Sequence, residues 1–588
     1  MNIEHVEKSY QELESDSTLQ NLIAQANARY ILYNTEESKE NFPRYTIKDE
    51  QLNILAFKYL NIGCNYFSEH NYLKASHSLE KGALILEYIH GSIHIQTKNK
   101  KLFCLISALS YYVCFQYSKA FILIGKLESD TMISSLVSLF LNRKFDQLLS
   151  EIDKLITNSS YGDEYLAEHF EEDNATKIYE IIIAKSLNYY VQFYQTGNKD
   201  FLEIAKKDLV NLQEVAAMRG EPDVWWVIRL LLLIIDGFKE SSLWYVLGNY
   251  FNTEDKLPLK YIQSLVYKNG SITELFLTQR NSLPKVLNNK QGSIVSIPTS
   301  SGKTRIGEIA ILNCLLNEPK AKILFIAPYR SLAYEIENSF DEIFSNLDVS
   351  VSHLYGGSLF SKLDERIIDE SSVIVATPEK AKALFRSNED ILSCIKLVII
   401  DEGHLLGTDK RLIVNEMFYE ELKYHVKANG GRFLLLSAVL PNAEDLSEWL
   451  TDSTDNVYKE NWRPSDERIG IMEWNGVSVN LNWKSTDAER NSFNPNFIMR
   501  QKLPKKPKER IMHYFPENKN QAIASTAYKL RKFGPVLIFV GIKKSVFAIA
   551  REYEKCIQPE EQKFRFRNKA NWRAFKLACI ESYGEDTE

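Results

Sequence analysis

The residues best suited to chemistry form a loop between an expected strand and an expected helix. Residues 293–297 are a mostly apolar run, and the helix is expected to begin near Lys303. A loop in this position directs consecutive backbone N–H groups, and the positive end of the helix dipole, toward a single anion. The loop residues predicted to bind a nucleotide are Pro298, Thr299, Ser300, Ser301, Gly302, Lys303 and Thr304.

Three of these loop residues suit specific tasks in phosphate binding. Gly302 stands where a Cβ atom would block the phosphate, and Lys303 supplies a point charge to the β- and γ-phosphates. The hydroxyl group of Thr304 is suited to bind Mg²⁺. Ile297 occupies the position of the first glycine in the common G-x-x-x-x-G-K-[ST] pattern. A helix-capping turn is therefore the alternative interpretation of this loop.

Two adjacent carboxylates provide the other half of this chemistry. Asp401 and Glu402 directly follow a second apolar run, residues 397–400. In ATPases with a phosphate-binding loop, one such carboxylate holds the Mg²⁺ that bridges the β- and γ-phosphates, and a general base orients the attacking water. We expect Asp401 to hold the metal ion and Glu402 to be the general base. A pair of ordinary surface charges is the alternative.

The elements that must position these residues begin near residue 271. From there, short runs rich in β-branched residues alternate with helical segments, which is typical of a parallel sheet covered by helices on both faces. Ligands of such sheets bind outside the carboxyl ends of the strands, so the segments that follow the strands should converge on one crevice. The expected strands are residues 293–297, 322–327, 349–354, 372–376, 397–400 and 432–436.

Residues 1–270 show amphipathic helical periodicity and predict an all-α domain. Part of this region has small and aromatic residues at the offsets of one tetratricopeptide repeat, where small residues let two helices pack closely. These residues are Tyr59, Ile62, Gly63, Tyr66, Ala75, Leu79 and Gly82. A second pair, residues 104–111 and 120–124, is less regular. Ordinary helical hairpins and a partner-docking solenoid both remain open for this region.

Composition limits the class of protein. The chain has 588 residues, 45% of them hydrophobic and 25% charged, with a net charge of −6, so any nucleic acid must be bound by local basic patches. The seven cysteines form no C-x-x-C pair, which favours a reducing compartment, expected to be the cytoplasm, and no structural zinc. The N-terminus lacks signal-peptide features. The longest apolar run, residues 225–235, is too short for a bilayer and predicts a buried helix.

The remainder of the chain suggests a connector and a further α/β segment. Residues 468–483 are rich in β-formers, and the basic, proline-broken stretch 500–510 is either a solvated linker or a nucleic-acid contact. A helix over 520–533 and a strand over 535–540 are expected next. The predicted domains are a helical domain (1–270), an α/β domain (271–465), a connector or insertion (466–515) and the start of a second α/β domain (516–588).

Several motifs together resemble those of superfamily 2 nucleic-acid helicases, and within them the Ski2-like, DExH-type branch. The matching segments are residues 297–304, 327–332, 377–380, 401–404 and 437–450. Arg463 and Pro464 resemble the pair that follows the first motor domain in that branch, and residues 536–545 resemble the motif that opens the second. The resemblance implies a RecA-like motor domain that uses ATP and Mg²⁺.

The resemblance also implies roles for further residues. Gln279 corresponds to the glutamine that reads adenine, and one amide offers both a donor and an acceptor for that purpose. His404 joins Lys303, Asp401 and Glu402 in the catalytic set. The residues expected to contact the sugar-phosphate backbone are Arg330, Gly356, Gly357, Thr377 and Lys380, and those expected to couple the nucleotide site to strand separation are Ser437, Ala438 and Val439. Val439 replaces the threonine of the family motif.

The expected function is an ATP-dependent helicase or translocase that moves on or unwinds DNA or RNA. One alternative is a nucleic-acid-stimulated ATPase that acts as a sensor or switch without processive unwinding. Another is a scaffold in which residues 1–270 bind a partner protein and the nucleotide site is regulatory. The arginine motif that the family places in its second motor domain does not occur in these 588 residues, so we expect this chain alone to hydrolyse ATP poorly. No membrane role is expected.

Overall fold

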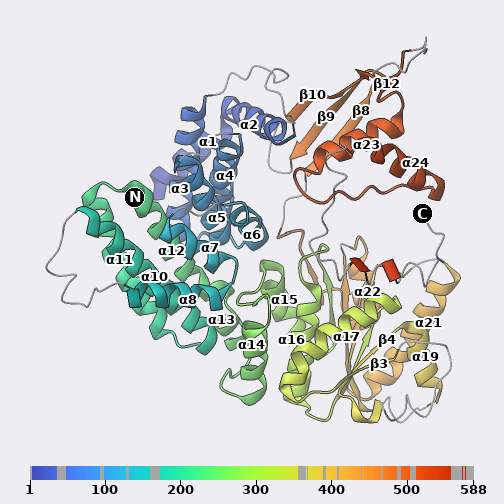
Figure 1. The fold of residues 1–588 in the computed structure, drawn as a ribbon. Coiled ribbons are helices and arrows are strands. Elements are labelled where there is room, and N and C mark those ends of the chain that lie inside the picture. Colours follow the sequence, from blue (N-terminus) through green and yellow to red (C-terminus); the bar gives the residue numbers. More distant parts are fainter. Residues whose placement is uncertain are drawn as a thin grey trace. The chain divides into compact units, whose positions relative to one another are not determined.

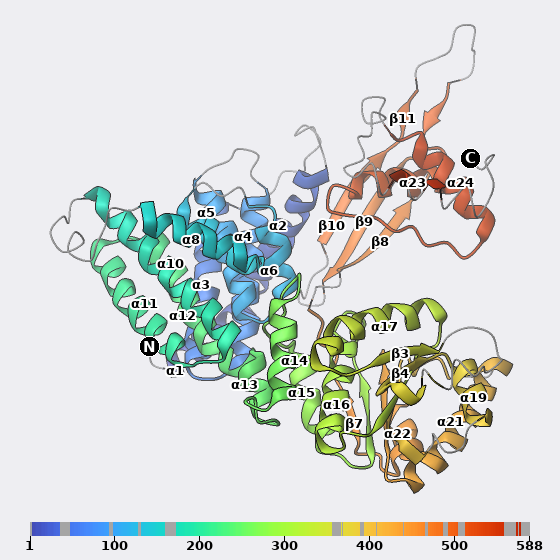
Figure 2. The same ribbon diagram turned by 60° about the horizontal axis from the view of Figure 1, so that its bottom comes forward.

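The computed structural model divides the chain into two compact units (Figures 1 and 2). The first consists of Met1–Tyr10, Asn53–His90 and Gln96–Asp466, and the second of Gln11–Leu52, Gly91–Ile95 and Glu467–Glu588. The residues that the structure describes are 3–35, 48–92, 98–127, 131–158, 172–354, 366, 368–387, 393–406, 409–438, 440–464, 468–485, 492–503, 512–557, 572–573 and 576–577.

The described residues before position 271 are helical, which confirms the predicted all-α region. The helices are α1 (Ile3–Ser15), α2 (Ser17–Thr35), α3 (Asp49–Ser68), α4 (Tyr72–Gly91), α5 (Lys98–Val113), α6 (Tyr117–Ile124), α7 (Met132–Leu141), α8 (Phe145–Asn158), α10 (Glu172–Thr196), α11 (Asp200–Arg219), α12 (Pro222–Ser241), α13 (Leu243–Gly248) and α14 (Lys256–Tyr267). In this described part, no helix is both long and apolar enough to cross a bilayer.

Small residues do bring α3 and α4 together as the repeat pattern predicts. A Cβ atom on Gly63 of α3 would lie 2.6 Å from Leu79 Cγ of α4, and one on Gly82 would lie 2.8 Å from the Leu60 side chain. Helices α5 and α6 form the second contacting pair. The apolar run at 225–235 lies within α12, whose side chains there are mostly buried, so the predicted buried helix is confirmed.

A seven-stranded parallel sheet forms the α/β part of the first unit, in the order β3-β4-β2-β5-β6-β1-β7. Its strands are β1 (Gly292–Ser296), β2 (Lys322–Ile326), β3 (Val351–Leu354), β4 (Val373–Ala376), β5 (Ile395–Ile400), β6 (Arg432–Ser437) and β7 (Val457–Lys459). The six expected strands are confirmed within two residues at each end. Sequence reasoning missed β7, a three-residue edge strand without a buried apolar run.

Helices cover both faces of this sheet, as predicted (Figure 1). Alternate strand residues point to opposite faces. Ile326, Val398 and Leu435 pack in a core with side chains of α19, α21 and α22, whereas Phe325 packs on Phe340 of α17. The helices of this part are α15 (Leu277–Leu287), α16 (Lys303–Asn317), α17 (Arg330–Phe344), α19 (Pro378–Ser387), α21 (Lys410–Ala428) and α22 (Ala443–Thr451).

The second unit is built around an antiparallel sheet of β8 (Arg468–Trp474), β9 (Ser478–Ser485) and β10 (Ser492–Met499). Helix α2, distant in sequence, packs on β10, and Asn494 Nδ2 donates to the carbonyl oxygen of Ala28 at 3.1 Å. Helices α23 (Lys519–Leu530) and α24 (Lys543–Glu554) follow, and α23 confirms the helix expected over 520–533. The pairing of α2 with this sheet was not predicted.

Two predictions in this region need correction. Residues 535–540 form no strand, and Leu537 and Phe539 are 92% and 90% exposed. A β-strand requires a neighbouring strand with which to exchange backbone hydrogen bonds, and the described residues provide no such strand beside this segment. The expected linker 500–510 begins with a short strand, β11 (Gln501–Lys502), which pairs with β12 (Tyr514–Phe515). Residues 504–511 lie outside the described residues, and the bounds of the four domains remain predictions.

Candidate nucleotide site

The glycine-lysine-threonine loop connects β1 to α16, so it has the strand, loop and helix context that its sequence predicts. Gly302 adopts a φ of 76°, a left-handed conformation that favours glycine. A Cβ atom at this position would lie 2.1 Å from Gln279 Nε2. Glycine is therefore required here by the packing of the protein itself, in addition to the space needed by a phosphate. Helix α16 begins at Lys303, next to the loop.

The two carboxylates follow β5 at the same edge of the sheet. Lys303 Nζ lies 3.3 Å from Glu402 Oε2, an ion pair between the loop and the acidic segment. His404 Nδ1 lies 3.2 Å from the same Glu402 oxygen and 3.4 Å from Ser437 Oγ, at the end of β6. The structure thus brings together Lys303, Glu402, His404 and Ser437, which come from three different strand ends.

Asp401 is buried beside Glu402. Burial, followed by the negative charge of Glu402, raises the pKa of the Asp401 carboxyl group to about 6. Its Oδ1 accepts a hydrogen bond from the Glu402 backbone N–H at 2.9 Å. A buried carboxylate with a raised pKa gains most from a nearby cation, because the cation offsets the lost hydration. The site therefore fits Mg²⁺, with Thr304, the second residue of α16, as the second predicted ligand.

Gly403, the residue after Glu402, positions this acidic turn. Glu402 has a φ of 52°, an uncommon conformation for a residue with a side chain. A Cβ atom on Gly403 would lie 2.6 Å from the Leu435 side chain, and the Gly403 N–H donates to the Leu436 carbonyl oxygen at 3.0 Å. The chain thus turns tightly against β6, which points the Glu402 carboxylate toward Lys303.

Gln279 reaches the nucleotide loop from α15. Its Oε1 accepts from the Phe276 backbone N–H at 2.8 Å, and its Nε2 donates to the Gly302 carbonyl oxygen at 3.0 Å. Thr278 Oγ1 also lies 3.4 Å from the Ser301 carbonyl oxygen. Both ends of the amide are engaged with the backbone, so reading of adenine by Gln279 would require it to share or exchange the Gly302 contact. That role stays a prediction.

Sequence reasoning missed several residues that hold this loop. Ser301 Oγ lies 3.4 Å from the Trp462 carbonyl oxygen, and the Trp462 and Phe276 ring centroids lie 6.0 Å apart. Trp462 belongs to the segment that follows β7. An aromatic residue in a polar stretch just before Arg463 was the available signal, but pairing with a loop more than a hundred residues away is a tertiary contact.

The residues predicted to contact a nucleic-acid backbone differ in their exposure to solvent. Arg330 is exposed at the start of α17, whereas Thr377 and Lys380 are buried. Gly356 and Gly357 lie outside the described residues, as does Val439 of the predicted coupling set. Arg411 was missed: its guanidinium group lies 2.8 Å from Glu379 and donates to the Pro328 carbonyl oxygen at 3.1 Å. It thereby joins two of the predicted backbone-contacting segments.

Comparisons with known proteins agree with this geometry. The DEAD/DEAH box helicase family matches residues 277–446. The chain is 40% identical over 595 residues to Hachiman protein HamB of Bacillus cereus, covering 100% of this chain and 52% of that protein. It is 33% identical over 218 residues to the ATP-dependent DNA helicase Hel308 of Thermococcus kodakarensis, covering 37% of this chain and 18% of that protein. The chain therefore spans about half the length of HamB and less of this Hel308.

Solved structures are less similar to this chain than the relatives found by sequence. The DUF1998 helicase MrfA bound to DNA aligns with a TM-score of 0.39 and 15% identity, over 56% of this chain and 43% of that one. The DEAD-box helicase Mss116 bound to single-stranded RNA aligns with a TM-score of 0.31 and 19% identity, over 36% of this chain and 44% of that one.

Proposed function

Because this chain carries a DEAD/DEAH box helicase domain of the Ski2-like kind within superfamily 2, we propose that it binds and hydrolyses ATP to move along or unwind a nucleic acid. The observation that carries this proposal is the convergence of Lys303 and Glu402, from the phosphate-binding loop and the acidic turn, at 3.3 Å. The raised pKa of Asp401 beside them supports a site built to receive a cation.

Each residue of the site has a task in this proposal. The Lys303 ammonium group would exchange its partner Glu402 for the β- and γ-phosphates, which leaves the Glu402 carboxylate free to accept a proton from the attacking water. Thr304 and Asp401 would hold Mg²⁺, which neutralises charge on the phosphates. His404 contacts both Glu402 and Ser437. It would orient the Glu402 carboxylate and couple the position of that carboxylate to Ser437 at the end of β6.

The nucleic acid would be bound through its backbone. Arg330 supplies an exposed cation suited to phosphate oxygens. The buried Lys380 and Thr377 would add a second cation and a hydroxyl group once this edge of the sheet opens on the strand. Arg411 would support this surface by holding the residue-328 and residue-379 segments together. Affinity would then depend on salt and little on base sequence.

A nucleotide-dependent switch without processive unwinding is the second candidate. The specific observation in its favour is that buried Glu274 joins α5, α10 and the α7–α8 turn of the N-terminal region to the segment that carries Gln279. Nucleotide binding could then be sensed by the helices. A strand-displacement assay run beside an ATPase assay separates the two candidates, because a switch would show stimulated ATPase activity and no displaced strand.

Two substitutions test the nucleotide site. Lys303→Ala should abolish Mg·ATP binding measured by calorimetry, whereas Glu402→Gln should retain binding and lower turnover by roughly 10²–10⁴. Lys290→Ala, an exposed lysine before β1, is the control and should change neither. Unchanged affinity in Lys303→Ala would remove the proposed function. The parent chain itself should turn over ATP slowly, because the arginine motif of the family does not occur in these 588 residues. A turnover of roughly 10 s⁻¹, typical of enzymes, would contradict that expectation.

The nucleic-acid surface is tested by salt dependence. The logarithm of the binding constant for single-stranded DNA or RNA should fall linearly with the logarithm of salt concentration. Arg330→Ala and Lys380→Ala should each reduce the magnitude of that slope by about one, as expected for the loss of one phosphate contact. Lys290→Ala should leave the slope unchanged. If both variants also leave it unchanged, the strand does not cross this part of the sheet edge.

A further inference from the structure

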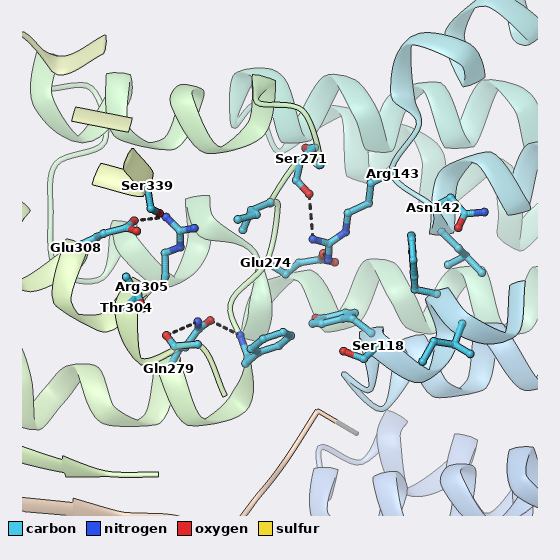
Figure 3. A pocket seen from close by; sticks show the side chains of 18 of the residues that line it. Ser118, Asn142, Arg143, Ser271, Glu274, Gln279, Thr304, Arg305, Glu308 and Ser339 are labelled. Atoms are coloured by element: carbon cyan, nitrogen blue, oxygen red, sulfur yellow. Dashed lines mark hydrogen bonds and ion pairs between the residues drawn. The ribbon is translucent and has the colours of Figure 1, made fainter. Parts of the chain in front are cut away.

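A cavity of about 640 Å³ opens beside the phosphate-binding loop, within the first unit (Figure 3). One wall belongs to the α/β part and includes Gln279, Gly302 and Thr304. The facing wall comes from the helical region. It includes Ser118 of α6 and Asn142 at the end of α7. The size is within the range of sites for small organic ligands, roughly 300–1,000 Å³.

We propose that the nucleoside part of the bound nucleotide enters this cavity, so that α6 and the α7–α8 turn form the outer wall of the nucleotide site. This rests on the proposed function, because the phosphates are taken to lie at the loop. Gly302 and Thr304 line the cavity and also belong to the loop that would hold the phosphates. A base and ribose attached to those phosphates therefore have this space directly beside them.

The lining has the chemistry of a nucleoside site. The rings of Phe276 and Tyr117, one from each wall, are nearly parallel at 26°, with centroids 6.1 Å apart, and present aromatic surface to the cavity. Polar groups are few, as expected of small-molecule sites. The Ser271 hydroxyl group lines the cavity and is buried without a hydrogen-bond partner among the described residues, and ribose hydroxyl groups are suitable partners for it. Arg305 adds a guanidinium group at the first turn of α16.

The helical wall is held firmly to the nucleotide-binding segment. Arg143 donates to Glu274 Oε2 at 2.9 Å and to the Ser271 carbonyl oxygen at 3.2 Å (Figure 3). Glu274 also accepts from the hydroxyl groups of Tyr112 and Tyr194 at 2.7 and 2.8 Å. Glu274 lies five residues before Gln279, the residue predicted to read adenine, so the same short segment carries both residues. A nucleoside in the cavity would therefore contact this segment and the helical region to which Glu274 ties it.

Filling the cavity from the helical side tests the proposal. Ser118→Trp on the full chain should place an indole ring in the cavity from the helical wall, which does not contain Lys303. We expect the affinity for Mg·ATP, measured by calorimetry, to fall at least tenfold, and the affinity for Mg·tripolyphosphate to stay within twofold of the parent. Lys126→Trp adds the same side chain at an exposed position just after α6 that does not line the cavity, and should change neither affinity.

The outcomes separate this inference from the function on which it rests. Lys303→Ala should weaken both ligands, and its failure to do so would remove the phosphate site itself. If Lys303→Ala behaves as expected but Ser118→Trp binds Mg·ATP within twofold of the parent, the nucleoside does not enter the cavity and the inference is wrong. Equal loss of Mg·ATP and Mg·tripolyphosphate in Ser118→Trp would also overturn it, because the cavity would then not be specific to the nucleoside part.

Discussion

At the scale of single residues, the charged groups of the candidate nucleotide site pair with one another. Lys303 pairs with Glu402, and Asp401 lies buried next to Glu402 with its pKa raised to about 6. The ion pair satisfies two of these groups, but the Asp401 carboxylate is ionised at neutral pH at a cost in folding free energy. Such a cost is understandable at a functional site, because the same carboxylate is then available to a metal ion.

Asp401→Asn should therefore stabilise the protein in the absence of Mg²⁺. The folded-state pKa lies above the ordinary value of 3.8, so the folded protein binds the proton more tightly, and the resulting stability is lost as pH rises from about 4 to about 6. A shift of this size corresponds to on the order of 3 kcal/mol. Asparagine keeps an oxygen for the Glu402 N–H and carries no charge.

Thermal unfolding without Mg²⁺ checks this expectation. The melting temperature of Asp401→Asn should exceed that of the parent at pH 7.5, and the difference should shrink as pH is lowered through 6. Asp341→Asn, at an exposed position on α17, should show no such difference. A lower melting temperature for Asp401→Asn at pH 7.5 would mean that the carboxylate stabilises the fold.

At the scale of elements, close helix packing depends on two glycines. Gly63 and Gly82 face the opposite helix so closely that a Cβ atom on either would lie under 3 Å from a leucine side chain. Gly63 would also approach the backbone nitrogen of Leu79 at 2.9 Å, and backbone cannot move aside as a side chain can. The repeat-like pattern in the sequence is thus explained by helix approach, whether or not this surface binds a partner.

Gly63→Ala should destabilise the protein by roughly 1–3 kcal/mol, the usual cost of overpacking, although alanine is the better helix former. Gly248→Ala is the control, because its nearest neighbour would be a Thr253 methyl group at 3.9 Å. Chemical denaturation followed by circular dichroism measures both. A gain in stability for Gly63→Ala would show that the α3–α4 contact relaxes easily.

At the scale of the first unit as a whole, a few buried polar contacts join the helical region to the α/β part. Tyr261 of α14 donates to Glu308 of α16 at 3.1 Å, and Glu308 also pairs with Arg305. Glu274 makes similar contacts: it accepts hydrogen bonds from Tyr112 of α5 and Tyr194 of α10, and it forms an ion pair with Arg143. The helices and the sheet therefore form one packed body around the nucleotide loop.

Glu274→Gln should loosen this body. It would leave the partly buried Arg143 without its fully buried counter-ion. Breaking a buried ion pair from one side typically costs roughly 3–5 kcal/mol. We expect a lower thermal midpoint and faster limited proteolysis between the helical region and β1. Glu254→Gln, at an exposed position before α14, should behave as the parent. Parent-like proteolysis of Glu274→Gln would show that other contacts suffice to hold the two parts.

The sequence alone predicted the candidate chemistry and most elements of the α/β part. The apolar strands, the loop at Lys303 and the acidic pair at Asp401 follow from local patterns, because strand burial and loop composition are properties of neighbouring residues. The alternation of strands and helices predicted a parallel sheet, but the strand order and the edge strand β7 came only from the structure. The position of each strand end relative to the others follows once the strands are parallel and adjacent.

Only the tertiary structure decided which distant segments meet. Glu274 with Arg143, Trp462 with Ser301, and α2 with β10 are contacts between residues that no local pattern relates. The strand expected over 535–540 is a case in which a local pattern predicted an element that did not form. An apolar run becomes a strand only where a neighbouring strand accepts its backbone hydrogen bonds. Local sequence sets what each segment can form, and the partners available in space set what it does form.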